Sequence, residues 1–381
     1  MDIPFNKPHI TGKEIHYINQ VISSCKLSGN GTFTKKCQDF FEFRYNFKKT
    51  LLTTSCTDAL EMCAMLIDIK EGDEVIVPSF TFVSTAIAFQ REGAKIVFAD
   101  SNPLNPNINV DIIESLITSK TKAIVVVHYA GIACDMDKIV QIANKYNIVI
   151  IEDAAQAIDS YYTNKDGVKK PIGSIGHLAA FSFHETKNII TGEGGMLVIN
   201  DQRYIQRSEI IWEKGTNRAE FFRGEVNKYG WVDKGSSFLP SELIAAFLWA
   251  QLEEIEDIQN VRSKIWNNYN DSLKKWAEIN GIQLPFIPKY STNNSHMFFM
   301  LCKNVDQRTK IMNYLKNSGI LSVFHYQSLH KSTYYKQSNP SNCNLSESDR
   351  YTDTLLRLPL YYDMTNDNMK KVIDILHLSL E

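Results

Sequence analysis

Residues 148–156 read IVIIEDAAQ, and this stretch decides the fold class. Four consecutive β-branched apolar residues are followed directly by Glu152 and Asp153. A strand that is apolar on both faces is typical of a parallel sheet covered by helices on both sides. We therefore expect an α/β fold in which Asp153 lies at the carboxyl end of a strand.

Similar β-branched runs recur along the first 200 residues, with helical patterns between several of them. We expect a mostly parallel seven-stranded sheet in a large domain of residues 1–240. The predicted strands are Thr50–Thr53, Glu74–Val77, Lys95–Phe98, Ala123–Val127, Ile148–Glu152, Leu178–Ser182 and Met196–Ile199. The predicted helices between them are Asp58–Ile67, Val110–Ile117 and Met136–Tyr146.

After Pro240 the pattern becomes mixed, which predicts a smaller α+β domain over residues 241–381. Its predicted helices are Ser241–Gln259, Val261–Ile279, Asp306–Ser318 and Thr365–Leu378. Its predicted strands are His296–Leu301 and Leu321–His325.

Composition excludes several classes of function. The net charge of −2 gives no reason to expect nucleic acid or an anionic membrane as a partner. The N-terminus does not resemble a secretory signal, and no apolar run is long enough to span a membrane. Seven cysteines without any Cys-x-x-Cys pair argue against a zinc site and fit a reducing compartment, so we expect a cytoplasmic protein without a metal.

Ligands of open α/β sheets bind beyond the carboxyl ends of the strands, so the residues that follow each strand matter most. Ser55, Cys56 and Thr57 follow the first strand and precede a helix. The free N–H groups of a helix N-terminus attract phosphate. A plain N-cap is the alternative interpretation of the same residues.

Asp153 and Lys187 follow two further strands. Asp153 either pairs with a protonated ring nitrogen or caps the next helix; strand alternation turns Glu152 the other way, toward a structural role. Lys187, in FSFHETKNIITGEGG (residues 181–195), either reacts as a desolvated amine with an aldehyde or is a solvated surface lysine. His184 alone is typical of a core histidine.

In combination these features predict a site for pyridoxal phosphate (PLP). A phosphate-binding turn, an aromatic residue, a carboxylate and a later lysine on one sheet edge are the parts that this cofactor needs. No Gly-x-Gly-x-x-Gly follows a strand and no Gly-x-x-x-x-Gly-Lys-Ser/Thr is present, which argues against dinucleotide-binding and P-loop enzymes.

The chain resembles the sugar aminotransferases of the DegT/DnrJ group over nearly its whole length. The motifs that carry the resemblance include TTSCTDALEM, GDEVIVPSFTFVST, IIEDAAQAI, FSFHETKN and FHYQSLH. The resemblance implies the PLP-dependent transferase fold of aspartate aminotransferase (fold type I). Within the group, HETKN (184–188) and KGTNRAEFFRGEVNKYGW (214–231) are most similar to transaminases that form dTDP-4-amino-4,6-dideoxygalactose.

The resemblance also implies roles for individual residues. Lys187 would bond covalently to the cofactor's aldehyde, Asp153 would pair with its ring nitrogen, and Gln156 would contact its phenolic oxygen. Phe82 would stack on the ring, and His184 would lie beside the cofactor. The residues expected to hold the phosphate are Ser55, Cys56, Thr57 and Ser182.

Substrate and subunit contacts follow from the same resemblance. His325, Tyr326 and His330 match the substrate-side motif. The segment Gly235–Leu239 corresponds to one that enters the partner's site in a homodimer, with Ser237 at the position of an asparagine that contacts the phosphate. The expected substrates are a nucleotide keto sugar and L-glutamate, for lipopolysaccharide or surface polysaccharide synthesis.

Other functions remain open at this point. The same family contains sugar dehydratases, which carry histidine in place of the lysine, and Lys187 argues against them. A regulatory protein without catalysis would leave the complete set of site residues unexplained. The product is either the 4-amino galacto sugar, its gluco epimer or a 3-amino sugar. Arg218 and Arg223 are candidates for binding the donor's carboxylate.

Overall fold

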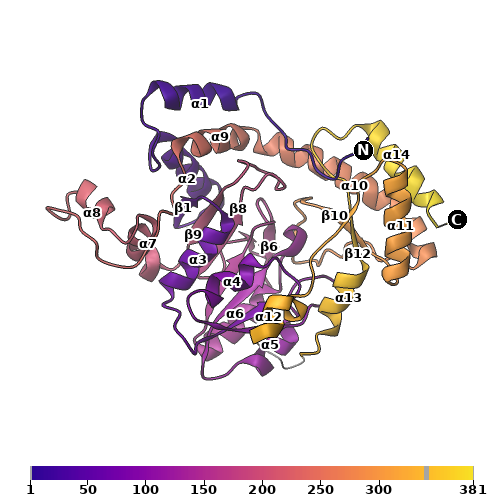
Figure 1. Ribbon diagram of the computed structural model, residues 1–381, viewed down its shortest axis with the longest axis horizontal. Coiled ribbons are helices and arrows are strands. Elements are labelled where there is room, and N and C mark those ends of the chain that lie inside the picture. The colour runs from indigo at the N-terminus through magenta and orange to yellow at the C-terminus, as the bar shows by residue number, and fades with distance from the viewer. Residues whose placement is uncertain (1, 339–342, 381) are drawn as a thin grey trace.

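The computed structural model describes residues 2–338 and 343–380. A seven-stranded sheet, in the order β1-β9-β8-β5-β4-β2-β3, forms the centre of the larger part (Figure 1). Six strands run in the same direction, and β9 runs against both of its neighbours. The strands are β1 (Lys49–Thr53), β2 (Glu74–Pro78), β3 (Lys95–Ala99), β4 (Thr121–Val127), β5 (Val149–Asp153), β8 (Leu178–Ser182) and β9 (Gly195–Ile199). The sheet and its strands thus agree with the predicted fold class.

Helices cover both faces of this sheet, which explains why its strands are apolar throughout. One face packs against α3 (Cys56–Leu66), α4 (Ser84–Gln90) and α7 (Ile205–Trp212). The other face packs against α2 (Thr32–Tyr45), α5 (Val110–Leu116), α6 (Met136–Tyr146) and α9 (Glu242–Glu253). Helix α1 (Glu14–Ser23) lies outside α9 (Figure 1).

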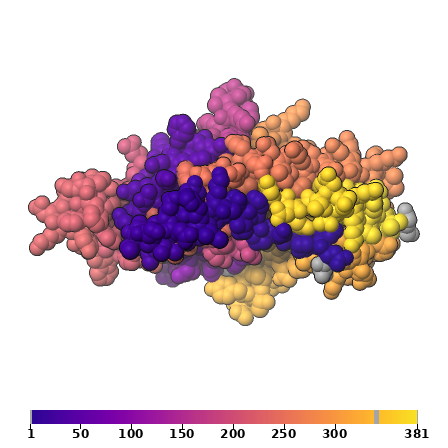
Figure 2. Space-filling view, turned by 90° about the horizontal axis from the view of Figure 1, so that it is seen from above, coloured from indigo at the N-terminus to yellow at the C-terminus, as the bar shows by residue number. Residues whose placement is uncertain are grey.

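The smaller part has a core of its own around a three-stranded antiparallel sheet. Its strands are ordered β10 (Phe298–Leu301), β12 (Leu355–Leu358) and β11 (Val323–Phe324). Helices α10 (Ile255–Asn280), α11 (Val305–Asn317) and α14 (Asn366–Leu378) surround it, and α13 (Ser346–Thr354) leads into β12. The N-terminal segment crosses to this part, where Ile3 joins its core (Figure 2).

Several predicted boundaries differ from the observed ones. The helix break expected near residue 260 lies at Glu254, because α10 buries an unbroken helical stripe that includes Ile258, Arg262 and Ile265. The central strand β12 was not predicted, since LLRL is too short to stand out from its surroundings. The short hairpin of β6 (Tyr161–Thr163) and β7 (Lys169–Pro171) was also missed.

The division of the chain at residue 240 remains a proposal. Residues of α9, including Ala245 and Leu248, belong to the core beneath the large sheet, and so does Ile258 near the start of α10. From Ile265 onward, α10 packs in the core of the smaller part. This packing favours a boundary inside α10, so that one continuous helix connects the two parts.

A buried hydrogen bond between Glu152 and His128 braces the centre of the large sheet. Glu152 and His128 have no exposed side-chain surface, and Nε2 of His128 lies 3.0 Å from the Glu152 carboxylate. The same carboxylate accepts hydrogen bonds from the N–H groups of Gly173, Ile175 and Gly176. Burial raises the pKa of Glu152, but these donors outweigh it and hold that pKa below its ordinary value. Glu152 therefore fixes the loop before β8, the structural role expected from its position.

Replacing Glu152 by alanine is expected to lower the free energy of unfolding by about 3–5 kcal/mol, because His128 and three backbone donors lose their acceptor. Urea unfolding measures the effect. Glu278→Ala is the control, since Glu278 is exposed on α10 and its loss should change stability by no more than about 0.5 kcal/mol. Equal losses in the two variants would contradict the structural role of Glu152.

The same carboxylate predicts a pH dependence. Because its pKa is lowered on folding, its contribution is fully present above the unfolded value of 4.5 and is lost as the pH falls through the lower folded value. The stability difference between the wild type and Glu152→Gln should therefore narrow as the pH falls below 4.5. A difference that stays constant down to acid unfolding would refute this.

Candidate active site

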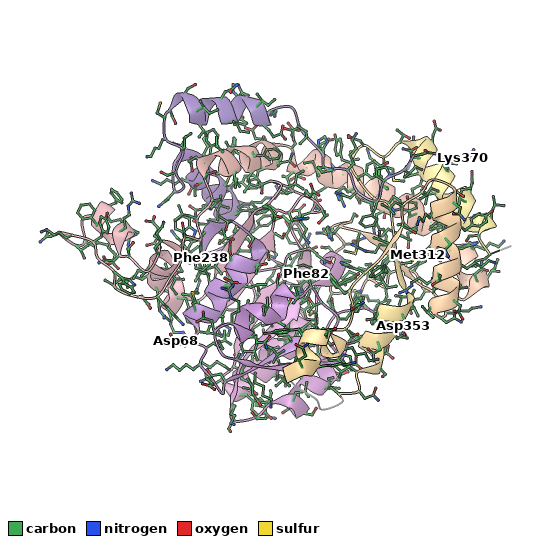
Figure 3. All side chains as sticks on the ribbon, in the orientation of Figure 1. Asp68, Phe82, Phe238, Met312, Asp353 and Lys370 are labelled. Atoms are coloured by element: carbon green, nitrogen blue, oxygen red, sulfur yellow. The ribbon has the colours of Figure 1, made fainter. Side chains whose placement is uncertain are left out.

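A cavity of about 840 Å³ lies where the carboxyl ends of the large-sheet strands meet the smaller part. The N-terminal arm also reaches it, through Phe5 and Asn6. Phe82 lies in the centre of the molecule, between the two parts (Figure 3). The predicted site residues that line this cavity are Ser55, Cys56, Thr57, Phe82, Asp153, Gln156, Ser182, His184, Lys187, His325 and Tyr326.

An anion-binding cradle forms one end of the cavity. Helix α3 starts at Cys56, directly after β1, and Ser55 caps it by accepting a hydrogen bond from the N–H of Asp58. The first N–H groups of a helix have no acceptor within it, so they attract an anion together with the helix dipole. The Thr57 hydroxyl adds a donor and lies 2.7 Å from that of Ser84, which also lines the cavity.

The reversed strand β9 closes this cradle, and only glycine allows it to do so. A Cβ atom added to Gly195 would lie 2.4 Å from the backbone nitrogen of Cys56. The glycine cluster therefore brings the start of β9 against the N-terminus of α3. Ser182, at the end of β8, contributes its hydroxyl to the same region.

Asp153 lies at the end of β5 with 5% of its surface exposed. Its carboxylate accepts hydrogen bonds from the Thr85 hydroxyl at 2.7 Å and from the N–H of Ala155 at 3.2 Å. Burial raises the pKa of Asp153, and these two bonds and the charge of Lys187 only partly offset that rise. No ion pair to Asp153 is present within the described ranges. The carboxylate is therefore oriented and would be stabilised by a cationic ligand.

Lys187 follows β8 in a turn whose backbone N–H donates to the carbonyl of His184. Loss of hydration lowers the pKa of Lys187, while Cys56 and Asp153 act in the opposite direction and Arg357 reinforces the decrease. A lowered pKa increases the fraction of neutral amine, which is the nucleophilic form. Lys187 and Asp153 thus present an amine and a carboxylate to one cavity.

Aromatic side chains border the space between these groups. Phe82 is 56% exposed, and its ring centroid lies 6.1 Å from that of Tyr326. Gln156 donates from Nε2 to the Tyr326 hydroxyl, and its Oε1 accepts from the N–H of Ala130. The amide of Gln156 therefore links the large sheet to Tyr326, and its predicted contact with a cofactor oxygen stays a prediction.

Histidines from the smaller part complete the wall of the cavity. His325 stacks on Tyr326 with ring centroids 3.5 Å apart, and its Nδ1 lies 2.7 Å from the Tyr129 hydroxyl. Nδ1 of His296 lies 2.9 Å from the side-chain oxygen of Asn188. Burial lowers the pKa of both histidines well below the ordinary value, so both are neutral near pH 7.

Two predicted site residues do not line the cavity. His330 is turned toward the end of β2, where its Nδ1 lies 2.7 Å from the Ser79 hydroxyl, because the short helix Leu329–Lys331 packs there. His330 thus lies outside the cavity lining, and a direct substrate contact for it stays a prediction. Ser237 is exposed and lies outside the cavity of its own chain, where its backbone forms an isolated antiparallel β-bridge with Glu213.

The two candidate arginines for the donor's carboxylate also lie outside the cavity. Arg223 is paired with Glu209 and Glu225, and Arg218 lies 3.8 Å from Glu213. Neither arginine lines the cavity. Arg218 lies on α8 (Arg218–Phe222) and Arg223 directly after it, and their charges are engaged by acids at α7 and just after α8.

The cavity also contains residues that were not predicted from the sequence, among them Ser84, Thr85, His296 and Arg357. Ser84 and Thr85 follow the predicted aromatic Phe82 within one helical turn, and this spacing was available as a signal. Nothing in the sequence alone places His296 or Arg357 opposite Lys187. These two residues come from the smaller part, and only its packing on the large sheet brings them there.

Comparison with known proteins gives a match along almost the entire chain. The model of the DegT/DnrJ/EryC1/StrS aminotransferase family matches residues 8–377. GDP-perosamine synthase of Escherichia coli O157:H7 is 32% identical over 84% of this chain and 83% of its own length. The spore coat polysaccharide biosynthesis protein SpsC of Bacillus subtilis is also 32% identical, over 98% of this chain and 95% of its own.

Solved structures show the same architecture. The PLP-form of the putative sugar aminotransferase Spr1654 from Streptococcus pneumoniae superposes with a TM-score of 0.89 at 25% identity, covering 100% of this chain and 98% of that one. An aminotransferase of the same family from Brucella abortus gives a TM-score of 0.85 at 27% identity, covering 96% and 94% of the two chains. The fold is thus that of PLP-dependent aminotransferases, as expected.

The residues of the cavity fit pyridoxal phosphate, which is the cofactor of these relatives and of this chain. The cradle at α3 matches a phosphate, and Asp153 lacks the cationic partner that a protonated ring nitrogen would supply. Phe82 offers an exposed aromatic face, and Lys187 offers an amine for the aldehyde. No group of three potential metal ligands occurs in the parts of the chain that the structure describes.

Lys187→Ala is expected to abolish covalent attachment of the cofactor and to reduce turnover to background, because no other described lysine lines the cavity. Borohydride reduction followed by mass spectrometry detects the attachment independently of activity. Lys170→Ala, at an exposed lysine of the β7 strand, is the control and should retain the label. Labelling of Lys187→Ala at wild-type levels would show that another amine is used.

Asp153→Asn is expected to leave the fold and cofactor binding intact and to lower kcat by about 10²–10³-fold, the cost of losing one oriented electrostatic partner. An amide in place of the carboxylate no longer favours a protonated ring nitrogen. Steady-state kinetics measures the effect, with Asp166→Asn on an exposed turn as the control. Equal rates for the two variants would remove Asp153 from the mechanism.

Proposed function

The chain belongs to the DegT/DnrJ/EryC1/StrS aminotransferase family and is a sugar aminotransferase; on that premise we propose that it transfers the amino group of L-glutamate to C4 of dTDP-4-keto-6-deoxy-D-glucose. The products would be dTDP-4-amino-4,6-dideoxy-D-galactose and 2-oxoglutarate. The nitrogen of glutamate replaces the keto oxygen of the sugar, which leaves as water. A second water molecule supplies the keto oxygen of 2-oxoglutarate, so water is neither gained nor lost overall.

The observation that best supports amino transfer is that Lys187 and Asp153 line the same cavity. When bound, the cofactor supplies an aldehyde that takes up the amino group and a ring that accepts the electrons of the broken bond. Asp153 holds the proton on the ring nitrogen. The released amine of Lys187 moves the proton between the donor Cα and C4′ of the cofactor.

The identity of the acceptor rests on narrower support. HETKN (184–188) and the FFRGEVNKYGW stretch (221–231) resemble transaminases that form the 4-amino galacto product. GDP-perosamine synthase, which is 32% identical to this chain, is named for a GDP-linked sugar. A GDP-linked keto sugar is therefore the main alternative to the dTDP-linked acceptor. Binding differences of about 1–3 kcal/mol in the pocket are enough to exchange such specificities.

Because Lys187 is fixed on one side of the cavity, the configuration of the product depends on the orientation of the bound sugar. The amine of Lys187 can deliver a proton to only one face of the bound intermediate, so the configuration at C4 follows from which way up the sugar lies. His325 and Tyr326 line the cavity and are placed to contact the sugar. A sugar bound with its other face toward Lys187 would give the gluco epimer, and a shifted 3-keto isomer would give a 3-amino product.

The name of one relative supports the biological setting that we propose. SpsC is named for spore coat polysaccharide biosynthesis, and we place this chain likewise in the synthesis of lipopolysaccharide or another surface polysaccharide. All seven cysteines are free, which is consistent with a reducing compartment such as the cytoplasm. Among the described residues, no helix is sufficiently long and apolar to cross a membrane.

A homodimer with shared sites is part of the proposal. The excursion formed by α8 and residues 223–236 extends away from the body of the molecule (Figures 1 and 2). It exposes 71% of Phe222, 52% of Tyr229 and 85% of Trp231. A cluster of exposed aromatic residues is typical of a surface that a partner covers. Ser237, which lies outside the cavity of its own chain, would then face the cofactor of the partner subunit.

Light scattering is expected to give twice the chain mass for the active enzyme. Trp231→Ala combined with Phe222→Ala should shift the population toward monomer, because the pair removes the largest exposed aromatic surface of the excursion. Phe43→Ala is the control, since Phe43 is 94% exposed on α2, away from the excursion. An active monomer would rule out shared sites.

The configuration of the product tests the acceptor assignment. Incubation with L-glutamate and dTDP-4-keto-6-deoxy-D-glucose should yield a sugar whose H4 has a small coupling to H3 in the proton NMR spectrum, as an axial amine requires. A large coupling would mean an equatorial amine and the gluco product. A parallel incubation with the GDP-linked 4-keto-6-deoxy sugar decides the nucleotide, and a higher kcat/KM there would overturn the dTDP assignment.

A further inference from the structure

Arg357 occupies an unusual position in the smaller part of the molecule. It lies on the central strand β12, between Leu356 and Leu358, which both pack into the core of that part. Strand alternation turns Arg357 to the opposite face, where it lines the cavity that also contains Lys187. Its strand partners are Phe299 and Val323.

The guanidinium of Arg357 is only partly satisfied by the protein. Nη2 donates to the carbonyl of Phe324 over 3.3 Å, a long hydrogen bond. Nε is buried and has no hydrogen-bond partner within the described ranges. The guanidinium carbon lies 4.7 Å from the centroid of the Phe5 ring, so the N-terminal arm holds the group in place. No carboxylate pairs with it among the described ion pairs.

Arg357 is also the one fixed positive charge that remains for a substrate among the described residues of the cavity. His296 and His325 are neutral near pH 7, because burial lowers the pKa of each well below the ordinary value. The amine of Lys187 is committed to the cofactor's aldehyde. An arginine stays protonated even when burial lowers its pKa, as it does for Arg357.

We propose that Arg357 binds a carboxylate of the amino donor, an inference that rests on the proposed function. A guanidinium presents parallel N–H donors in a planar fork that matches the two oxygens of a carboxylate. Nε and Nη2 lie on the same side of that fork. A carboxylate received there satisfies the buried Nε, and Nη2 exchanges its long bond to the Phe324 carbonyl for a charged acceptor.

A carboxylate fits this position better than the diphosphate of the sugar nucleotide. The carboxylate of an amino acid is attached to the carbon that reacts, so it must lie close to Lys187. Arg357 meets this requirement, since it lines the same cavity as Lys187. The diphosphate is attached at C1, across the sugar ring from the reacting C4, and would lie farther from the lysine.

The test separates binding of the donor from binding of the sugar. Glutarate, a dicarboxylate without an amino group, is titrated into the PLP-loaded enzyme by calorimetry. Arg357→Gln is expected to weaken glutarate binding by about 10- to 100-fold, the range for losing hydrogen bonds to a charged group. Arg357→Lys, which keeps the charge but not the fork, should show an intermediate loss.

Arg308 provides a matched control. It also belongs to the smaller part, has a buried Nε without a partner among the described residues, and lies near an aromatic ring, 5.9 Å from that of Phe324. It donates to the carbonyl of Thr352 and does not line the cavity. Arg308→Lys should therefore bind glutarate with wild-type affinity.

The two half-reactions give a second readout. With L-glutamate, the visible absorption of Arg357→Gln should bleach only at concentrations about 10- to 100-fold higher than for the wild type. The variant preloaded with pyridoxamine phosphate should react with the keto sugar at a rate within about twofold of the wild-type rate. This split distinguishes donor binding from general damage, which would slow both halves.

Different results would contradict the role of Arg357 and the proposed use of glutamate as the donor. Unchanged glutarate affinity in Arg357→Gln, equal loss in both half-reactions, or loss confined to the sugar half would overturn the inference. Wild-type enzyme that binds glutarate through Arg357 but transfers no amino group from glutamate would instead refute the proposed donor and support the carboxylate site.

Discussion

A buried carboxylate without a cationic partner is the constraint on which the arrangement of the site depends. Removing a carboxylate from water is costly unless donors or a positive charge replace the lost hydration. At Asp153 the protein supplies two hydrogen bonds, one from Thr85 and one from the backbone of Ala155, and these do not restore an ordinary pKa. A protonated ring nitrogen would complete the compensation, so folding prepares the position that the cofactor fills.

At the adjacent residue, Glu152, hydrogen-bond donors fully replace the hydration that the buried carboxylate loses. Its carboxylate is also buried, yet His128 and three backbone N–H groups hold its pKa below the ordinary value. Two neighbouring acids on one strand therefore face opposite sides of the sheet and have opposite electrostatic environments. The acid with complete partners is structural, and the acid with incomplete partners faces the cavity. This contrast is the physical basis for assigning Asp153 to chemistry.

Much of the large sheet and of the cofactor side of the cavity could be predicted from the sequence. Apolar strands, the helix start at Cys56 and the glycines before β9 are local signals, and parallel strands bring their carboxyl ends to one edge. The substrate side could not be predicted in this way. Arg357 lies on a four-residue strand and reaches the cavity only through long-range packing. His330 shares a motif with His325, but a short helix turns it toward Ser79.

Amino transfer by this chain requires that Lys187, Asp153 and the cradle at α3 together bind pyridoxal phosphate in a reactive form. Titration of the purified chain with the cofactor, followed by absorption spectroscopy, tests this in one measurement. We expect a visible absorption band that saturates at one cofactor per chain and bleaches when L-glutamate is added. A chain that develops no such band, or whose band is unaffected by every amino acid tried, would contradict it.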